Sequence, residues 1–334
     1  MGSGNAEGDF MTDVSVVVPI YNEEESVDLL ADRLHEALSS IGRSYEILLI
    51  DDGSSDATWS KLCAISERLP HFRLIRFRRN FGQTAAMSAG FDAARGEAVV
   101  TLDADLQNDP ADIPRLLERF DQGFDVVSGW RKDRKDKFLS RRLPSMMANA
   151  LISKITGVRL HDYGCTLKVY RNEVIKNVQL YGEMHRFIPA LASWVGGSLD
   201  EVEVNHHARQ FGESKYGISR TFRVVLDLMT VKFLLRYSTG PIQLYGKLAA
   251  WFLVPGLAIL TFVMLTNLSF HLFGTTFGAD LIKRPIWIMF PFLMLFLGMQ
   301  LVSIGLLAEV QVRTYHESQG KPIYVVRETR DASS

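Results

Sequence analysis

Short apolar runs alternate with longer amphipathic segments along the first part of the chain. The runs are rich in β-branched residues and predict strands at Ser15–Ile20, Glu46–Ile50, Arg73–Phe77, Ala98–Leu102 and Asp125–Gly129. Apolar side chains recur at helical spacing from Val27 to Ile41, and further helices are expected at Gln83–Ala94 and Pro114–Phe120. This alternation predicts an α/β fold in which helices cover both faces of a mostly parallel sheet.

Polar motifs follow three of the predicted strands at the point where each strand ends. Pro19–Glu23 follows the first strand, Asp51–Gly53 the second and Asp103–Asp105 the fourth. Open sheets bind their ligands at the carboxyl ends of parallel strands. The three motifs are therefore expected to face one crevice.

Asp103-Ala104-Asp105 is the motif with the clearest chemistry. Two carboxylates one residue apart suit Mg²⁺ or Mn²⁺, which share their coordination sphere with substrate phosphates. The chain has no GxGxxG or Walker sequence, so a nucleotide diphosphate is expected to be held through the metal. Taken alone, the motif is equally compatible with a turn that caps the next helix.

Two uncharged apolar runs, Leu248–Leu265 and Pro285–Ala308, lie near the end of the chain. Runs of roughly 20 apolar residues match a bilayer core, and Trp251 and Trp287 suit its interfaces. The runs predict a hairpin of two transmembrane helices, at about 244–268 and 285–308. The alternative, two core helices of a soluble protein, is disfavoured because neither run carries a polar face.

Basic residues are more frequent on the chain segments outside this hairpin than in its connecting loop. Such a bias predicts that the N-terminal region and both termini are cytoplasmic. Ser219–Tyr237 mixes apolar and basic residues and suits either an amphipathic helix on the membrane surface or a plain connecting helix. The expected organisation is a disordered or appended lead (1–12), a catalytic domain (13–217), juxtamembrane helices (218–240), the membrane hairpin (241–310) and a cytoplasmic tail (311–334).

Composition narrows the function further. The 334 residues carry a formal net charge of −1, so no basic field favours nucleic acid. Cys63 and Cys165 are too few for a disulfide framework, and they suit a reducing cytosol. Cys165 is expected to be a small buried residue, and the adjacent His206 and His207 are expected to be structural.

Six motifs together resemble a known family. VVVPIYNEEE, IDDGSSD, RNFGQTAA, LDADLQNDP, DYGC and RQFGESKYG occur in the order seen in family-2 glycosyltransferases that use polyprenyl phosphate. These are the dolichyl-phosphate mannosyltransferase-like enzymes, and the bacterial GtrB and ArnC type, with two C-terminal membrane helices, is the most similar. The resemblance covers about Val14 to Tyr324. It implies a GT-A fold (a Rossmann-like α/β domain) and inverting transfer of a sugar from a nucleotide donor to membrane-bound polyprenyl phosphate.

The resemblance also implies roles for individual residues. Asp103 and Asp105 match the metal and diphosphate site, which Gln107 completes, and Asp105, Arg131 and Asp162 are the catalytic candidates. The implied donor-binding residues are Pro19, Tyr21, Glu23, Ile50, Asp52, Asp103, Ala104, Asp105, Arg209 and Lys215.

The acceptor is a phosphate monoester, which is already largely an oxyanion at neutral pH. A strong base is therefore not required, and guanidinium groups suit the acceptor phosphate. Arg131, Arg134, Arg141 and Ser145 are the acceptor candidates, although a solvated or lipid-facing basic loop is an alternative reading of the cluster. Asp162 either acts on substrate, as a base or by orienting it, or only binds an arginine.

The sugar is not determined by the motifs, because His185 and Arg186 depart from the patterns expected at that place. A UDP-sugar is the favoured donor, with GDP-mannose second. A processive polysaccharide synthase is disfavoured because the chain lacks the Gln-x-x-Arg-Trp motif of such enzymes. A catalytically inactive membrane scaffold is disfavoured because Asp103, Asp105, Arg209 and Lys215 are all present, and a scaffold does not require them. Related bacterial enzymes imply a homo-oligomer, a tetramer by resemblance.

Overall fold

A computed structural model of the chain describes residues 12–132, 143–178, 180, 184–208, 242–274, 281, 283–318 and 323–331. For residues 143–148, 242–244, 309–310 and 312–318 it describes the backbone alone. The chain divides into two units, Met1–Val231 with Pro322–Ser334, and Lys232–Lys321. Both chain segments that flank the second unit therefore belong to the first.

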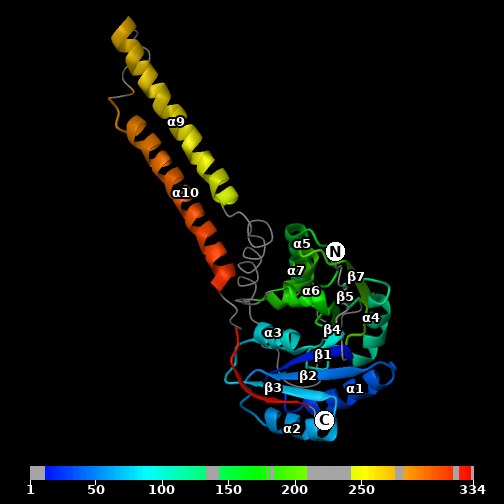
Figure 1. Ribbon diagram of the computed structural model, residues 1–334. Helices are drawn as coiled ribbons and strands as arrows, with labels where there is room; N and C mark the ends of the chain where they lie inside the picture. The colour runs from blue at the N-terminus through cyan, green and yellow to red at the C-terminus, as the bar shows by residue number, and fades with distance from the viewer. Residues whose placement is uncertain are drawn as a thin grey trace, which may run out of the picture. The chain divides into compact units, whose positions relative to one another are not determined.

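The first unit is built on an eight-stranded mixed sheet in the order β7-β5-β6-β4-β1-β2-β3-β8 (Figure 1). Its strands are β1 (Thr12–Ile20), β2 (Tyr45–Asp51), β3 (Phe72–Phe77), β4 (Gly96–Thr101), β5 (Val126–Trp130), β6 (Lys168–Arg171), β7 (Leu199–Glu203) and β8 (Val326–Arg330). The pairs β1–β2, β1–β4, β2–β3 and β5–β7 are parallel. The five strands expected from the sequence are all present.

Helices cover both faces of the sheet because successive side chains of β1 point to opposite sides. Val16 and Val18 pack into the core cluster with α1 (Val27–Ser39), α2 (Thr58–Arg68) and α4 (Ile113–Phe120). On the other face, Val17 meets α3 (Gln83–Ala93), where a Cβ added to Gly90 would lie 2.1 Å from a Val17 methyl group. Figure 1 shows α3 on the face opposite α1 and α2.

The remaining elements of this unit are two 3₁₀ turns, η1 (Pro110–Asp112) and η3 (Met184–Phe187), and three helices, α5 (Leu143–Thr156), α6 (Asn172–Lys176) and α7 (Ile188–Trp194). η3 contacts both α7 and α3, so the His185 segment is held against the end of the sheet that carries the polar motifs.

β8 is an element that the sequence did not predict. Residues 311–334 were expected to form a tail, yet Val326–Arg330 pairs antiparallel with β3 at the edge of the sheet. Tyr324 stacks on Phe77 with ring centroids 5.1 Å apart, and its hydroxyl donates to Asp92 Oδ2 at 2.8 Å. The chain beyond the apolar hairpin therefore returns to the first unit.

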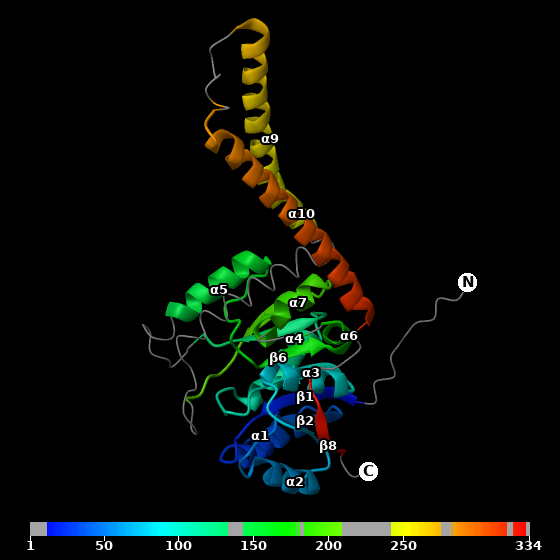
Figure 2. The same ribbon diagram turned by 90° about the vertical axis from the view of Figure 1, so that its left-hand side faces the viewer.

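The second unit is a hairpin of two long helices, α9 (Ile242–Phe273) and α10 (Ile286–Ser318), which lie side by side in Figures 1 and 2. Gly298 faces Leu253, and Gly305 faces Tyr245, so closely that an added Cβ would clash. Small residues allow this approach in membrane helix pairs. Both helices are long and apolar enough to cross a membrane, and only 17% of the most apolar window of each is buried. That exposure is contrary to the alternative of soluble core helices.

Candidate active site

The loops after β1 and β2 are joined by side-chain hydrogen bonds. Asn22 donates its backbone N–H to Ser54 Oγ at 2.9 Å, and its Oδ1 accepts from the Ser55 N–H at 2.9 Å. Asn22 has a φ of 52°, which is a left-handed conformation that asparagine tolerates better than most residues. The first two polar motifs therefore form one connected surface, as the strand order predicts.

Asp52 connects this surface to the RNFGQ segment that precedes α3. Its carboxylate accepts from the Phe81 N–H at 2.7 Å and the Gly82 N–H at 2.9 Å. Burial raises the pKa of Asp52, and the two backbone hydrogen bonds oppose that rise. Gly53 beside it has a φ of +71°, and an added Cβ would lie 2.4 Å from the Arg79 carbonyl carbon. Glycine is therefore required for the close approach of the two loops.

Asp103 and Asp105 follow β4 in the same region. Gln83 at the start of α3 donates its Nε2 to Asp103 Oδ1 at 2.7 Å. Burial, followed by the charge of Asp105, raises the pKa of Asp103 to about 6. Leu106 adopts a φ of 58°, a rare conformation for a branched side chain, and it reverses the chain directly after the acidic pair.

This donor set fits Mg²⁺ or Mn²⁺. The two carboxylates repel each other, and a divalent cation between them would relieve that repulsion. Within the described residues no group of three or more His, Cys, Asp or Glu side chains forms a complete metal cage. Mg²⁺ needs only one or two carboxylates when water and substrate phosphates supply its other ligands.

Arg131, which follows β5, forms a bidentate ion pair with Asp162. Its Nε lies 2.7 Å from Asp162 Oδ2, and one terminal nitrogen lies 3.0 Å from Oδ1. Burial opposes the charge of Arg131, but the hydrogen bonds and charge of Asp162 outweigh it and raise the pKa of Arg131. Both Asp162 oxygens face the guanidinium, so the geometry supports the arginine-binding alternative for Asp162, and its role as a base stays a prediction.

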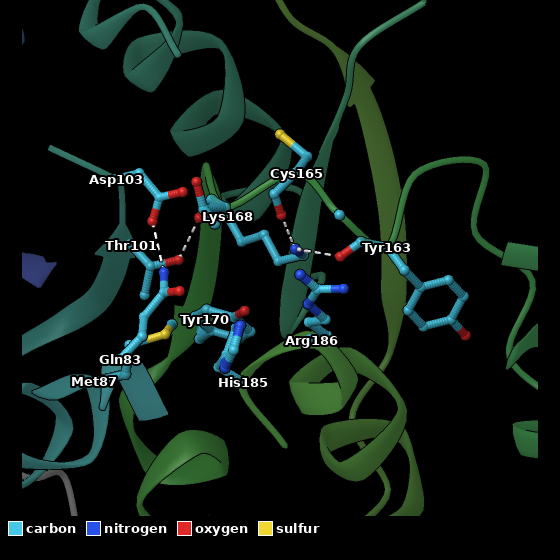
Figure 3. Close-up of a pocket in the computed structure, with 12 residues that line it drawn as sticks. Gln83, Met87, Thr101, Asp103, Tyr163, Cys165, Lys168, Tyr170, His185 and Arg186 are labelled. Atoms are coloured by element: carbon cyan, nitrogen blue, oxygen red, sulfur yellow. Dashed lines mark hydrogen bonds between the residues drawn. The ribbon is translucent and has the colours of Figure 1, made fainter. Parts of the chain in front are cut away.

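A small pocket lies between Asp103 and β6 (Figure 3). It is lined by Gln83, Met87, Thr101, Asp103, Tyr163, Gly164, Cys165, Thr166, Lys168, Tyr170, His185 and Arg186. Lys168 is 3% exposed, and its ammonium donates to the backbone carbonyl oxygens of Tyr163 and Cys165. The pocket therefore joins Asp103 to a buried cation.

The other predicted donor residues are distributed around these loops. Tyr21 is 38% exposed, and Glu23 accepts from Ser26 Oγ at 2.7 Å. Pro19 and Gln107 are half-buried, and the Gln107 backbone N–H donates to Asp105 Oδ1 at 3.1 Å. Ile50 and Ala104 are buried, Ile50 completely, so Ile50 acts through packing of β2 in this structure.

Four predicted residues, Arg134, Arg141, Arg209 and Lys215, lie outside the described residues, as does the segment 218–240. Ser145 lies in α5, where the backbone alone is described. The roles of these residues stay predictions from the resemblance.

Gln83, Thr101, Lys168 and Tyr170 are among the pocket residues that were not singled out from the sequence. Lys168 could have been noticed in the sequence, because it interrupts the apolar run Leu167–Tyr170. A charge within a buried strand is costly unless it is paired or hydrogen-bonded. The other three are of types common in any sheet or helix, and their alignment depends on the pairing of β4 with β6.

Cys165 is completely buried, and burial raises the pKa of its thiol, as suits a small structural residue. His207 lies 2.9 Å from Asp109 Oδ2, and His206 forms an isolated bridge with Asn108. Neither histidine lines the pocket described above.

Comparison with known proteins places this geometry in context. The model of "Glycosyl transferase family 2" matches residues 15–179. A dodecaprenyl-phosphate galacturonate synthase of Rhizobium johnstonii is 46% identical over 96% of this chain and 94% of its own. An undecaprenyl-phosphate 4-deoxy-4-formamido-L-arabinose transferase of Pseudomonas paraeruginosa is 38% identical over 96% of this chain and 91% of its own.

Among solved structures, the sheet resembles glucosyl-3-phosphoglycerate synthase of Mycobacterium tuberculosis. One structure of that enzyme, with Mn²⁺ and UDP-glucose, gives a TM-score of 0.52 at 16% identity and covers 66% of this chain and 79% of that one. At this identity the likeness shows the GT-A fold alone. The family match and the identity to full-length relatives go further, and they show that the chain is a glycosyltransferase that belongs to family 2.

Proposed function

We propose that the chain transfers one sugar from a UDP-sugar to a membrane-bound polyprenyl phosphate, with inversion at the anomeric carbon. The observation that carries the proposal is that Arg131 lies beside the pocket of Asp103, since Gly164 lines that pocket and a Cβ added to it would lie 3.2 Å from a terminal nitrogen of Arg131. A donor diphosphate and an acceptor phosphate have to meet in this reaction. The relatives named for prenyl-phosphate sugar transfer support the same acceptor class.

The donor end of the site would hold the nucleotide diphosphate. Asp103 and Asp105, with Gln107, would bind Mg²⁺ or Mn²⁺, which when bound supplies positive charge that stabilises the departing diphosphate. The loops tied together by Asn22 and Asp52 would form the nucleotide pocket. Arg209 and Lys215 are proposed to complete the contacts to the diphosphate.

The acceptor end would be organised by Arg131. Asp162 occupies two of the guanidinium N–H groups and fixes the plane of the group, and the remaining N–H groups stay available for a phosphate. The acceptor oxygen is already ionised and attacks directly, so the task of this end is to hold two anions together. Arg134, Arg141 and Ser145 are proposed to assist.

The sugar can be one of several classes, because the two relatives above are named for galacturonate and for a formamido-arabinose. UDP is the proposed carrier, with GDP-mannose as the alternative donor. A processive synthase is a weaker alternative, because the described hairpin supplies only two candidate spans for a polysaccharide channel.

The membrane arrangement follows from the hairpin. Lys247, Arg313 and Lys321 flank its open end, whereas Lys283 and Arg284 lie in the connecting loop. β8 returns the chain to the sheet, so both flanking segments are expected on one side. We propose that this side is cytoplasmic, and that the protein is a homo-oligomer, a tetramer by resemblance.

A coupled assay of nucleotide release tests this function. Purified full-length protein in detergent with Mg²⁺ would be given a panel of UDP- and GDP-sugars, with and without undecaprenyl phosphate. The proposal predicts release of UDP that depends on the lipid phosphate. Release that is the same without the lipid would contradict it.

A further inference from the structure

The pocket beside Asp103 has room for one small substituent. Its volume is about 40 Å³, which corresponds to roughly three water molecules or one group with three heavy atoms. Gln83 and Asp103 lie on one side of it, and the Lys168 side chain on β6 runs across it to the carbonyl oxygens of Tyr163 and Cys165 on the other side (Figure 3). Because the donor sugar is attached directly to the diphosphate, a substituent on its ring would lie near this wall.

The charge of the pocket is unusual for the inside of a sheet. An ammonium group has three N–H donors, and Lys168 uses two of them on the carbonyl oxygens of Tyr163 and Cys165. No carboxylate forms an ion pair with Lys168 among the residues that the structure describes. Burial lowers the pKa of Lys168 because the charge lacks solvent. A buried cation of this kind is stabilised by a bound anion.

A second cationic side chain comes from η3. The Arg186 side chain points into the pocket from below Lys168 in the view of Figure 3. The adjoining His185 is 7% exposed, and its Nδ1 lies 2.9 Å from Thr84 Oγ1 at the start of α3. This contact holds the η3 segment, and with it Arg186, in a fixed place.

Resting on the proposed function, we propose that this pocket binds a carboxylate carried by the donor sugar. The substrate class is then a nucleotide-activated uronic acid, and Lys168 and Arg186 determine its specificity. A neutral hydroxymethyl group in the same place would add no counter-charge to Lys168, which the carboxylates of Asp162 and Asp103 attract without forming an ion pair with it. A carboxylate accepts hydrogen bonds from both the ammonium and the guanidinium.

Calorimetry of donor binding tests the assignment without turnover. The probes are two matched pairs, UDP-glucuronic acid with UDP-glucose and UDP-galacturonic acid with UDP-galactose, and UDP alone is the reference. Each pair differs only in the carboxylate. We expect the full-length protein to bind at least one uronic acid nucleotide roughly ten- to a hundred-fold more tightly than its neutral partner.

Variants assign that preference to the pocket. Arg186→Gln is expected to reduce the ratio of affinities within the preferred pair several-fold, and Arg186→Lys to retain part of it. Arg115→Gln is the matched control, because Arg115 is an exposed arginine on α4 that pairs with Asp112. It is expected to keep the wild-type ratio. Lys168→Met provides a second test if the variant folds, and Arg186→Gln is sufficient if it does not.

Three results would overturn the inference. The first is equal affinity within both pairs in the wild-type protein, and the second is an unchanged ratio in Arg186→Gln. The third is an Arg186→Gln variant that loses as much affinity for UDP as for the uronic acid nucleotide, because Arg186 would then contact the diphosphate. The proposed function fails separately, when no donor gives lipid-dependent release of UDP whatever the ratio of affinities.

Discussion

At the scale of residues, the strand-end motifs carry most of what could be predicted. A polar motif after an apolar run is visible in the chain, and parallel pairing of β1, β2 and β4 brings three such motifs together. In the sequence Arg186 stands out only as a departure from an expected pattern, and Lys168 is not singled out, because both depend on a pocket that they share with Gln83 and Asp103, which lie far from them in the chain. Pairing across a sheet, unlike the end of a strand, leaves no local pattern.

Removal of the metal is the first prediction at this scale. EDTA is expected to abolish sugar transfer, and Mg²⁺ or Mn²⁺ to restore it. The reason is that a divalent cation would relieve the repulsion between Asp103 and Asp105 and stabilise the departing diphosphate. Asp105→Asn should lower kcat at least a hundred-fold. Asp109→Asn is the control, since that carboxylate binds His207. Full activity in the presence of the chelator would exclude the metal role.

The Asp162–Arg131 pair gives a second prediction. Asp162→Asn removes the charge that orients Arg131, so kcat/KM for polyprenyl phosphate should fall at least ten-fold. The affinity for UDP, measured by calorimetry, should change less than two-fold. An equal loss at both ends of the site would mean that Asp162 does not act through the acceptor arginine.

At the scale of elements, the predicted strands and helices share one property, a clear period of apolar residues. β7 and β8 lack it, since their sequences LDEVE and VRETR are mostly charged and lie at the edges of the sheet. Such strands form because a neighbour offers a free edge rather than because their own side chains require burial. That is why the sequence predicted a tail at 311–334 and no strand within it.

Asp125 lies directly before β5 and forms hydrogen bonds with Ser198, directly before β7, and with Arg171, at the end of β6. The lowered pKa of Asp125 predicts that the stability of the protein depends on pH. Burial raises the pKa of Asp125, but hydrogen bonds from Ser198 and Arg171 outweigh it and lower the pKa below 3.8. A depressed carboxyl pKa contributes stability that is present above 3.8 and lost as the pH falls through the folded value. Asp125→Asn should therefore cost about 1–3 kcal/mol at pH 7.

The same variant should lose this disadvantage in acid. The unfolded carboxyl becomes protonated near pH 3.8 and the folded one only at lower pH, so the difference in stability between the two proteins is expected to narrow progressively as the pH falls below about 4. Denaturant unfolding of both proteins in detergent at pH 7, at pH 3.5 and at still lower pH measures the narrowing. If the difference in unfolding free energy between the two proteins does not change with pH, Asp125 stabilises the fold without using its charge.

The stacking of Tyr324 on Phe77 predicts an effect of β8 on the donor site. Phe77 packs edge-on against Phe81, whose N–H holds Asp52. Tyr324→Ala should lower the affinity for UDP about three- to ten-fold, within the range of one lost aromatic pair. Tyr324→Phe keeps the ring and should retain most of the affinity. Wild-type binding by the alanine variant would show that the tail does not support the site.

At the scale of the whole molecule, the division into an N-terminal unit and an apolar hairpin could be predicted from hydropathy alone. The return of the chain to the sheet could not, because β8 has no hydrophobic pattern of its own. We infer that this family-2 glycosyltransferase unit carries two apolar helices because its acceptor is a lipid.

Mass spectrometry of the lipid tests that claim most directly. Purified protein would be incubated with undecaprenyl phosphate, Mg²⁺ and each UDP-sugar of the panel. The lipid would then be extracted and its molecular mass measured. The account predicts a product heavier than the starting lipid by one sugar residue, formed with a uronic acid donor in preference to its neutral partner. An unchanged lipid with every donor, or a ladder of several sugars on one lipid, would contradict it.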